Sequence, residues 1–153
     1  MPLADKPPGT LLRIALRAPN ALYRLHLDRL LGHRFLQLTH KGRRTGAPHK
    51  TVLEVVGRHR TTGAHYVAAG WGKKSDWYRN ILADPDVGVR VAGHTFDATA
   101  RTLDGAEALR VLEAYERDYK IAAREIKRLF GYPTISALAA HIPIIELLPT
   151  RRR

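Results

Sequence analysis

The feature that most constrains the fold is a basic turn that joins two short apolar runs. Phe35 to Thr39 and Thr51 to Val56 have the composition of β-strands, and Lys41 to Lys50 between them holds two glycines and a proline. Glycine and proline in a connection this short mark a turn. The pattern therefore predicts a hairpin, and with it an antiparallel sheet.

Further elements follow the hairpin at short spacings. Ala92-Gly93 is typical of a two-residue turn between strands, and Asp104 with Glu107 forms a capping box at a helix start. Short strands joined by short turns favour a sheet that curls on itself, so we expect an α+β fold with a compact antiparallel β-barrel of about six strands and flanking helices. The expected strands are 35–39, 51–56, 65–69, 87–91, 94–102 and 143–148, and the expected helices are two short ones within 10–32, one over 76–83, one over 104–119 and a further run to 130.

Length and composition indicate a single core domain. The chain has 153 residues and no cysteine, which excludes disulfides, a thiolate nucleophile and Cys-ligated metal. No stretch reaches the roughly 20 apolar residues of a membrane span, and no secretory pattern is present. We expect a cytoplasmic protein in three parts: a basic N-terminal arm with amphipathic helices (1–34), the barrel domain (35–150) and a basic tail (151–153).

The net charge of +12 is concentrated in the first part of the chain. Residues 1–60 carry 12 Lys/Arg and 3 Asp/Glu, whereas residues 61–150 carry 11 of each. Such a field suits nucleic acid, an anionic membrane surface or a polyanionic small molecule. The helices within 10–32 either pack on the domain or rest on anionic lipid. Nucleic acid is disfavoured because no helix-turn-helix, RNP or OB-like aromatic platform is found.

Two loops rich in small and cationic residues form the candidate binding site. The basic turn offers arginine forks, the Thr45 hydroxyl and backbone N–H groups, all of which suit a phosphate or carboxylate. The second loop, Gly70 to Ser75, follows the third strand and runs into a helix that opens with Trp77-Tyr78. Trp71 and Trp77 then wall a flat heteroaromatic ring; alternatively, Trp77 packs in the core and Trp71 is an exposed loop residue.

The sequence lacks the patterns of most other chemistries. Its eight histidines form no i, i+4 pair on a predicted helix, and no metal site is expected. It holds no Gly-x-Ser-x-Gly elbow, no Gly-x-Gly-x-x-Gly and no Walker loop. If the chain is an enzyme, the chemistry belongs to a cofactor.

Two blocks of the chain together are a more specific family signal than either block alone. Leu36 to Thr39, followed by Gly42-Arg43-Arg44-Thr45-Gly46-Ala47-Pro48, resembles the strand and phosphate loop of the deazaflavin-dependent nitroreductases, actinobacterial proteins with a split β-barrel fold. Trp77 to Val87 resembles their Trp-Tyr-x-Asn-Leu-x-x-Asn-Pro-x-Val block, and Ile142 to Ile144 resembles their closing strand. The resemblance covers residues 35–148.

This resemblance implies an oxidoreductase that transfers hydride from reduced coenzyme F420 to a quinone, enone or nitro-type acceptor. F420 is an 8-hydroxy-5-deazaflavin with a ribityl phosphate and an oligoglutamate tail, a polyanion that suits the basic first 60 residues. By carry-over, Arg44, Thr45 and the backbone of Gly46 hold the phosphate or the first carboxylates, and Tyr132 faces the acceptor. The expected cofactor-binding residues are Arg43, Arg44, Thr45, Gly46, His49, Lys50, Val52, Gly70, Trp71, Gly72, Lys73, Lys74, Trp77 and Asn80.

Three departures from the family pattern concern the substrate more than the cofactor. His49 stands where the family commonly has arginine, Val52 where many relatives have proline, and Trp71 where a small or cationic residue is usual. Lys50 replaces the arginine functionally, or phosphate binding becomes pH-sensitive through His49. FMN in the same barrel, a non-enzymatic cofactor- or lipid-binding protein and a nucleic-acid-binding protein are the alternatives. The chain is expected to be a monomer or a homodimer, since small split barrels often pair to protect their edges.

Overall fold

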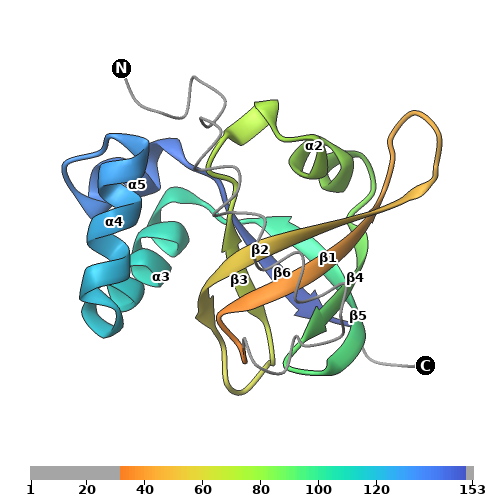
Figure 1. Ribbon diagram of the computed structural model, residues 1–153, viewed down its shortest axis with the longest axis horizontal. Coiled ribbons are helices and arrows are strands. Elements are labelled where there is room, and N and C mark those ends of the chain that lie inside the picture. Colours follow the sequence, from red (N-terminus) through yellow and green to blue (C-terminus); the bar gives the residue numbers. More distant parts are fainter. Residues whose placement is uncertain (1–31, 151–153) are drawn as a thin grey trace.

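The computed structural model describes residues 32–150, so the predicted N-terminal helices and the basic tail lie outside the described residues. Within this range six strands and four α-helices alternate with short connections (Figure 1). The strands are β1 (Phe35–Lys41), β2 (Pro48–Arg58), β3 (His65–Ala68), β4 (Asp86–Val91), β5 (His94–Thr102) and β6 (Ile144–Pro149). The helices are the short 3-10 helix η3 (Gly72–Lys74) and α2 (Asp76–Ala83), α3 (Gly105–Asp118), α4 (Lys120–Phe130) and α5 (Ile135–His141).

The strands close into a barrel in the order β1-β2-β3-β6-β5-β4. Closure comes from β1, which pairs antiparallel with both β2 and β4. Alternate residues of β1 point inward, and Leu36 and Leu38 are fully buried in a core shared with Val67, Val89 and Leu147. The predicted α+β fold with an antiparallel six-stranded barrel is confirmed.

The hairpin between β1 and β2 is longer than predicted, and its turn is shorter. Pairing continues through His40 opposite His49 and Lys41 opposite Pro48, which leaves only Gly42 to Ala47 outside the strands. His49 and Lys50 therefore lie on β2 and are held by the ladder. The β4–β5 turn matches its prediction, because Ala92 and Gly93 both have positive φ, 49° and 81°, as a two-residue hairpin turn requires.

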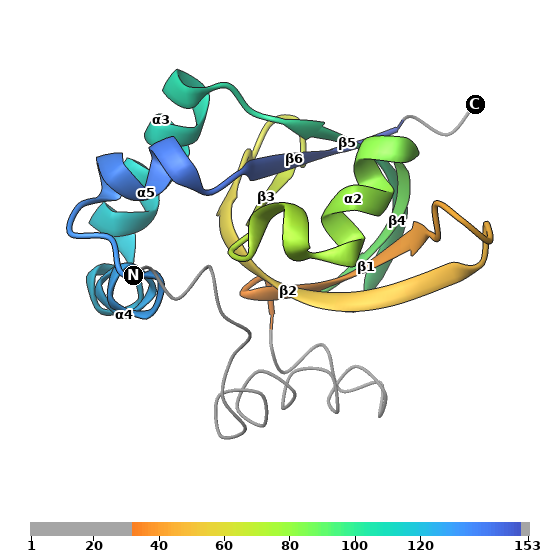
Figure 2. The same ribbon diagram turned by 90° about the horizontal axis from the view of Figure 1, so that it is seen from above.

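Helices α3, α4 and α5 lie together on one side of the barrel, and α2 lies apart from them (Figures 1 and 2). The predicted capping box is present: the Asp104 carboxylate accepts from the backbone N–H of Glu107, and Glu107 accepts from that of Asp104. Helix α4 ends at Gly131, whose φ of +76° suits glycine. The three helices enclose a second apolar cluster, built on Leu112, Phe130, Ile135, Leu138 and Ile144.

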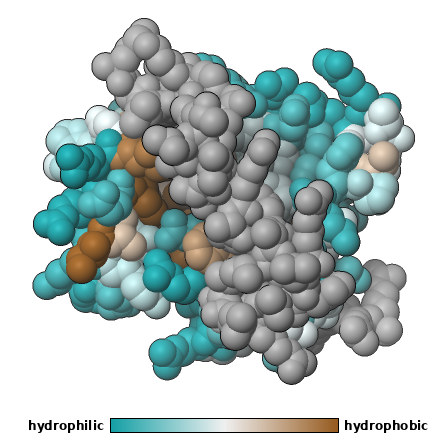
Figure 3. Space-filling view, viewed as in Figure 1, coloured by the Kyte–Doolittle hydropathy of each residue, from teal (hydrophilic) through white to brown (hydrophobic). Residues whose placement is uncertain are grey.

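Helix α5 was not predicted. Its seven residues stand between two prolines, and Thr134 caps it by accepting from the backbone N–H of Ala137. In Figure 3 the apolar atoms on the visible face gather on the side of α4 and α5. Of the described helices, none combines the length and the apolar character needed to cross a membrane.

Candidate functional site

A cleft of about 600 Å³ lies between the basic turn and helix α2. The hairpin supplies one wall and the first turns of α2 supply the other, so residues about 35 positions apart meet there. Its size falls in the range of small-molecule sites. The lining residues are His40, Gly42, Arg43, Arg44, Thr45, His49, Lys50, Thr51, Asp76, Trp77, Arg79 and Asn80.

Asn80 fastens the turn to α2. Its Oδ1 accepts from the backbone N–H of Arg43 at 3.1 Å and from the Arg43 guanidinium at 2.9 Å. Because that oxygen is engaged twice, the Asn80 amide Nδ2 donates to Nδ1 of His40 at 3.0 Å. These three hydrogen bonds are buried or partly buried, and Asn80 is only 3% exposed. The turn is thus positioned by hydrogen bonds to a buried amide.

The turn itself is closed by short backbone bonds that depend on glycine. The N–H of Gly42 donates to the Ala47 carbonyl and that of Gly46 to the Gly42 carbonyl, both at 2.8 Å. Gly46 has a φ of +71°, and a Cβ on Gly42 would lie 2.9 Å from Nε2 of His49. The Thr45 hydroxyl accepts from the Ala47 N–H at 3.2 Å. The glycines therefore let the loop fold close against His49.

The cations of the cleft divide into two groups. Arg43 is committed to the protein, since it also pairs with the Asp76 carboxylate at 3.2 Å. Arg44 and Lys50 are exposed and make no hydrogen bond or ion pair with any other described residue. Asp76 contributes the one carboxylate among the described residues that line the cleft, and Arg43 neutralises it. The cleft therefore offers uncompensated positive charge to an anion.

Two stacked histidines, the buried His40 and the exposed His49, line the cleft. The rings of His40 and His49 lie 5.8 Å apart, with 26° between their planes. Burial, and then the neighbouring His49, lower the pKa of His40, while Asp76 opposes them. His40 is therefore neutral at pH 7 and accepts the Asn80 bond through Nδ1.

The second predicted loop does not line this cleft. Trp71 packs edge-on against Phe130, with ring centroids 5.4 Å apart, in the helical cluster. A Cβ on Gly70 would lie 2.3 Å from Cζ of Phe130, so this glycine makes room for the aromatic ring. Gly72 to Lys74 form η3, which α2 holds through a hydrogen bond from Arg79 Nε to the Lys73 carbonyl. The structure brings Trp77 and Asn80 together with the turn, but not Gly70 to Lys74.

Neither of the two interpretations of Trp71 and Trp77 describes both residues. Trp77 is half-buried and packs on the barrel core while one part of it lines the cleft. Trp71 is half-buried as well, not the exposed loop residue of the alternative interpretation.

Val52 and Tyr132 lie outside the cleft. Val52 is on the outer face of β2, opposite Gln37 of β1. Tyr132 follows α4 and stacks on His141 at 5.3 Å, within the helical cluster that also holds Trp71.

Several lining residues were not predicted from the sequence. His40 could have been found, since it continues the inward alternation of Leu36 and Leu38 at a polar position. Asp76 and Arg79 project from the first turn of α2 and join the cleft only because α2 packs against the hairpin, so no sequence signal identifies them.

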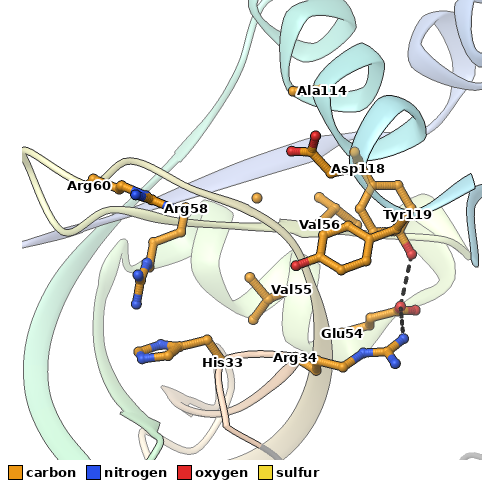
Figure 4. A pocket seen from close by; sticks show the side chains of 12 residues that line it. His33, Arg34, Glu54, Val55, Val56, Arg58, Arg60, Ala114, Asp118 and Tyr119 are labelled. Atoms are coloured by element: carbon orange, nitrogen blue, oxygen red, sulfur yellow. Dashed lines mark hydrogen bonds and ion pairs between the residues drawn. The ribbon is translucent and has the colours of Figure 1, made fainter.

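A second cavity, of about 370 Å³, lies between β2 and the end of α3 (Figure 4). In it the Tyr115 hydroxyl donates to Oε1 of Glu54 at 2.9 Å, and the Arg34 guanidinium lies 3.9 Å from the same oxygen. Burial raises the pKa of Glu54 against the opposing effects of Tyr115 and Arg34. Burial and the Glu54 carboxylate together raise the pKa of Tyr115, which stays protonated. The remaining wall is formed by His33, Val55, Val56, Gly57, Arg58, Arg60, Ala114, Asp118 and Tyr119.

Among residues 32–150, no three His, Cys, Asp or Glu side chains are grouped so that they could hold a metal ion.

Comparison with known proteins connects this architecture to a family. Residues 17–127, more than half of the chain, match the family model described as F420H(2)-dependent quinone reductase. No curated protein matches the sequence.

Solved structures support the barrel fold. An F420-H2-dependent reductase (FDR-A) is 23% identical, with a TM-score of 0.56, over 76% of this chain and 95% of the other. A domain-swapped dimer is 22% identical, also with a TM-score of 0.56, over 85% of this chain and 99% of the other. A pyridoxamine 5′-phosphate oxidase-related, FMN-binding protein from Nostoc punctiforme is 15% identical, with a TM-score of 0.57, over 87% of this chain and 80% of the other.

Proposed function

Because the chain belongs to the F420H(2)-dependent quinone reductase family and is thus an F420-dependent oxidoreductase, we propose that it reduces a small quinone-, enone- or nitro-type acceptor. Coenzyme F420 is its cofactor. When bound and reduced, the deazaflavin supplies the hydride. The protein's part is to bind the cofactor, to place the acceptor beside it at about 3–3.5 Å and to exclude water.

The unpaired positive charge of the cleft is the observation that assigns F420 binding to this site. Arg44 and Lys50 have no partner among the described residues, while the one lining carboxylate is neutralised by Arg43. The phosphate and glutamate carboxylates of F420 are the complementary charges, and guanidinium groups bind such oxygens in a bidentate manner. The fit extends to the backbone, because Gly46 has open space where a Cβ would lie, so a ligand can approach the turn closely there.

Individual roles follow from position. Arg44 and Lys50 bind the anionic oxygens, and Thr45 with the Gly46 N–H completes the anion site. His49 stands on the strand beside them, and Trp77 forms an aromatic wall. Arg43 and Asn80 act indirectly, since they hold the turn in place. The family resemblance implies that Gly70, Trp71, Gly72 and Lys73 line the ring and ribityl; they do not line the cleft, but they belong to the segment that leads into α2.

The deciding experiment is a fluorescence titration of the full chain with oxidised F420, with FMN titrated at equal salt. One-to-one saturation at about micromolar concentration, roughly −8 kcal/mol, is expected, with FMN binding much more weakly. Saturation by FMN alone would assign the barrel to a different cofactor. Binding of neither, with salt-sensitive binding of DNA, would contradict the proposal in favour of a nucleic-acid partner.

A contact with anionic membrane through residues 10–32 is a further part of this proposal. It is supported by the amphipathic, arginine-rich sequence of that segment, which except for Gly32 lies outside the described residues. Sedimentation with anionic vesicles should be lost when residues 1–32 are deleted; persistent co-sedimentation would refute the role of this segment.

A further inference from the structure

The cavity between β2 and α3 is joined to the basic cleft by one face of a single strand. Lys50, Val52 and Glu54 alternate along β2 and pair with Thr39, Gln37 and Phe35 of β1. The intervening residues Thr51 and Leu53 pair with Leu38 and Leu36, which are fully buried inside the barrel. Lys50, Val52 and Glu54 therefore share the outer face, and about 13 Å of strand separates the first from the last.

Both ends of this face are built for binding, but their chemistry differs. The Lys50 end meets the cleft with its unpaired cations. The Glu54 end opens into a cavity with apolar walls from Val55, Val56 and Ala114, and with a carboxyl group already hydrogen-bonded to Tyr115. Figure 4 shows His33 and Arg58 on one side of this cavity and Glu54 and Tyr119 on the other. A small neutral ring with carbonyl oxygens suits such walls and donors.

We propose that this cavity is the acceptor pocket, that it takes a quinone or enone, and that Glu54 is the catalytic acid that protonates the reduced acceptor. The inference rests on the proposed function, since the cofactor on the Lys50 side of Val52 supplies the hydride. The proposal assigns a role to Glu54, which does not line the cleft. It places the acceptor and the anion site at opposite ends of the same strand face.

The electron and proton balance requires one acid. A quinone gains one hydride, which oxidises the reduced deazaflavin, and the resulting hydroquinone anion takes one proton. In this proposal the proton leaves the carboxylic acid of Glu54, and the carboxylate regains a proton from water. An enone is reduced in the same way, with hydride added to carbon and the enolate protonated.

The hydrogen bonds around Glu54 suit a proton donor. Oε1 accepts from Tyr115 and faces Arg34, while Oε2 has no partner among the described residues. The protonated form therefore keeps Oε1 as acceptor and presents O–H at Oε2. Burial, which raises the pKa of Glu54, keeps a larger fraction protonated than at an exposed glutamate. Tyr115 fixes the group, because its hydroxyl, whose raised pKa keeps it protonated, donates to Oε1.

The first test replaces the acid without changing its size. Glu54→Gln in the full chain should lower kcat for menadione and for cyclohexenone by about 100-fold, the scale of general acid catalysis. Its affinity for F420 in the fluorescence titration should stay unchanged. Glu113→Gln, the same change on the exposed part of α3, is the matched control and should retain wild-type turnover. Wild-type turnover by Glu54→Gln would overturn the proposal.

A second test addresses the pocket without the cofactor. Ala114→Phe fills the cavity from α3, and it should weaken menadione binding to the cofactor-free protein at least 10-fold by calorimetry. Ala106→Phe on the exposed first turn of α3 is its control. Unchanged menadione affinity in Ala114→Phe would place the acceptor elsewhere. Failure of the wild type to bind F420 would instead contradict the proposed function, while this binding measurement would still decide whether the cavity takes a quinone.

Discussion

Charged side chains at the two ends of strand β2 differ in whether the protein itself supplies their partners. At its beginning, the cleft leaves Arg44 and Lys50 exposed and unpaired within the described structure, while the buried Asn80 holds the loop that carries them. Toward its end, the one carboxyl group held between β2 and α3 has partners within the protein: Glu54 receives a bond from Tyr115 and faces Arg34 among the described residues. Charge that the protein does not satisfy is available to a ligand, whereas charge that it satisfies is held for a specific geometry.

Within the cleft itself, paired and unpaired charges also lie side by side. Arg43 and Arg44 are neighbours in the sequence, yet the first is bonded to Asn80 and Asp76 and the second to no described residue. Of these neighbouring arginines, one holds the loop and the other is left available to a ligand.

The largest effect is expected from removing the amide that positions the loop. Asn80→Ala leaves the Arg43 N–H and His40 without their partner, and buried groups left unpaired cost about 1–3 kcal/mol each. We expect a loss of about 2–4 kcal/mol in the free energy of unfolding by urea, together with weaker F420 binding. Leu82→Ala, at a 56% exposed site on the same helix, should change stability by under about 0.5 kcal/mol. Equal stability of the two variants would show that the loop does not depend on Asn80.

The adjacent arginines test the division of roles directly. Arg44→Ala should weaken F420 binding by about 1.5–3 kcal/mol, the scale of a charge-assisted hydrogen bond, or roughly 10- to 150-fold, with unfolding unchanged. Arg43→Ala should lower stability as well, because it removes the bonds to Asn80 and Asp76. The two variants are compared by titration and by urea unfolding. An unchanged affinity in Arg44→Ala would remove that residue from the anion site.

The fold was largely predictable from sequence because its signals are local. The alternation of Leu36 and Leu38, the Ala92-Gly93 turn and the Asp104 capping box each depend on residues a few positions apart, and the structure contains all three. The extent of the β1–β2 ladder was not predictable in this way. Pairing across the barrel carries the strands into the basic segment, so His49 and Lys50 belong to a strand.

The site was predictable only in part, because it depends on contacts between distant residues. The turn and Asn80 meet as predicted, yet Gly70 and Trp71 face Phe130, which lies some sixty residues away. Helix α5 is similar: Ile135 and Leu138 are buried in the helical cluster, and that packing favours a helix which seven residues alone do not specify. Glu54 counts in the sequence prediction only as one of the 3 Asp/Glu of residues 1–60, although its alternation with Lys50 and Val52 along a strand places the three on one face.

The pH dependence of stability tests the end of the barrel that lies beside the cavity. His33, at the edge of the cavity, stacks on His65, which is 4% exposed. Burial, then His33, lowers the pKa of His65 to about 4. Since an unfolded histidine titrates near 6.5, stability is complete above that pH and falls as the pH drops toward 4.

The expected size follows from the two pKa values. Between pH 7 and pH 5 the wild type should lose about 2 kcal/mol of unfolding free energy through His65. His65→Leu should flatten this dependence, and His94→Gln, at an exposed position, should leave it in place. The measurement is urea unfolding at both pH values. An equally steep loss in His65→Leu would assign the acid sensitivity to another group.

The smallest effect concerns the helix that carries Tyr115 to the cavity. Asp104 begins α3 by accepting from the Glu107 N–H at 2.8 Å, and Glu107 in turn binds Arg101. Asp104→Ala removes the cap, at a cost of about 1 kcal/mol measured by urea unfolding. Because the cap lies three helical turns before Tyr115 and outside both binding sites, F420 affinity should not change. A fall in F420 affinity would show that the two ends of β2 are coupled through α3; an unchanged affinity with lower stability would show that F420 binding does not depend on how firmly α3 begins.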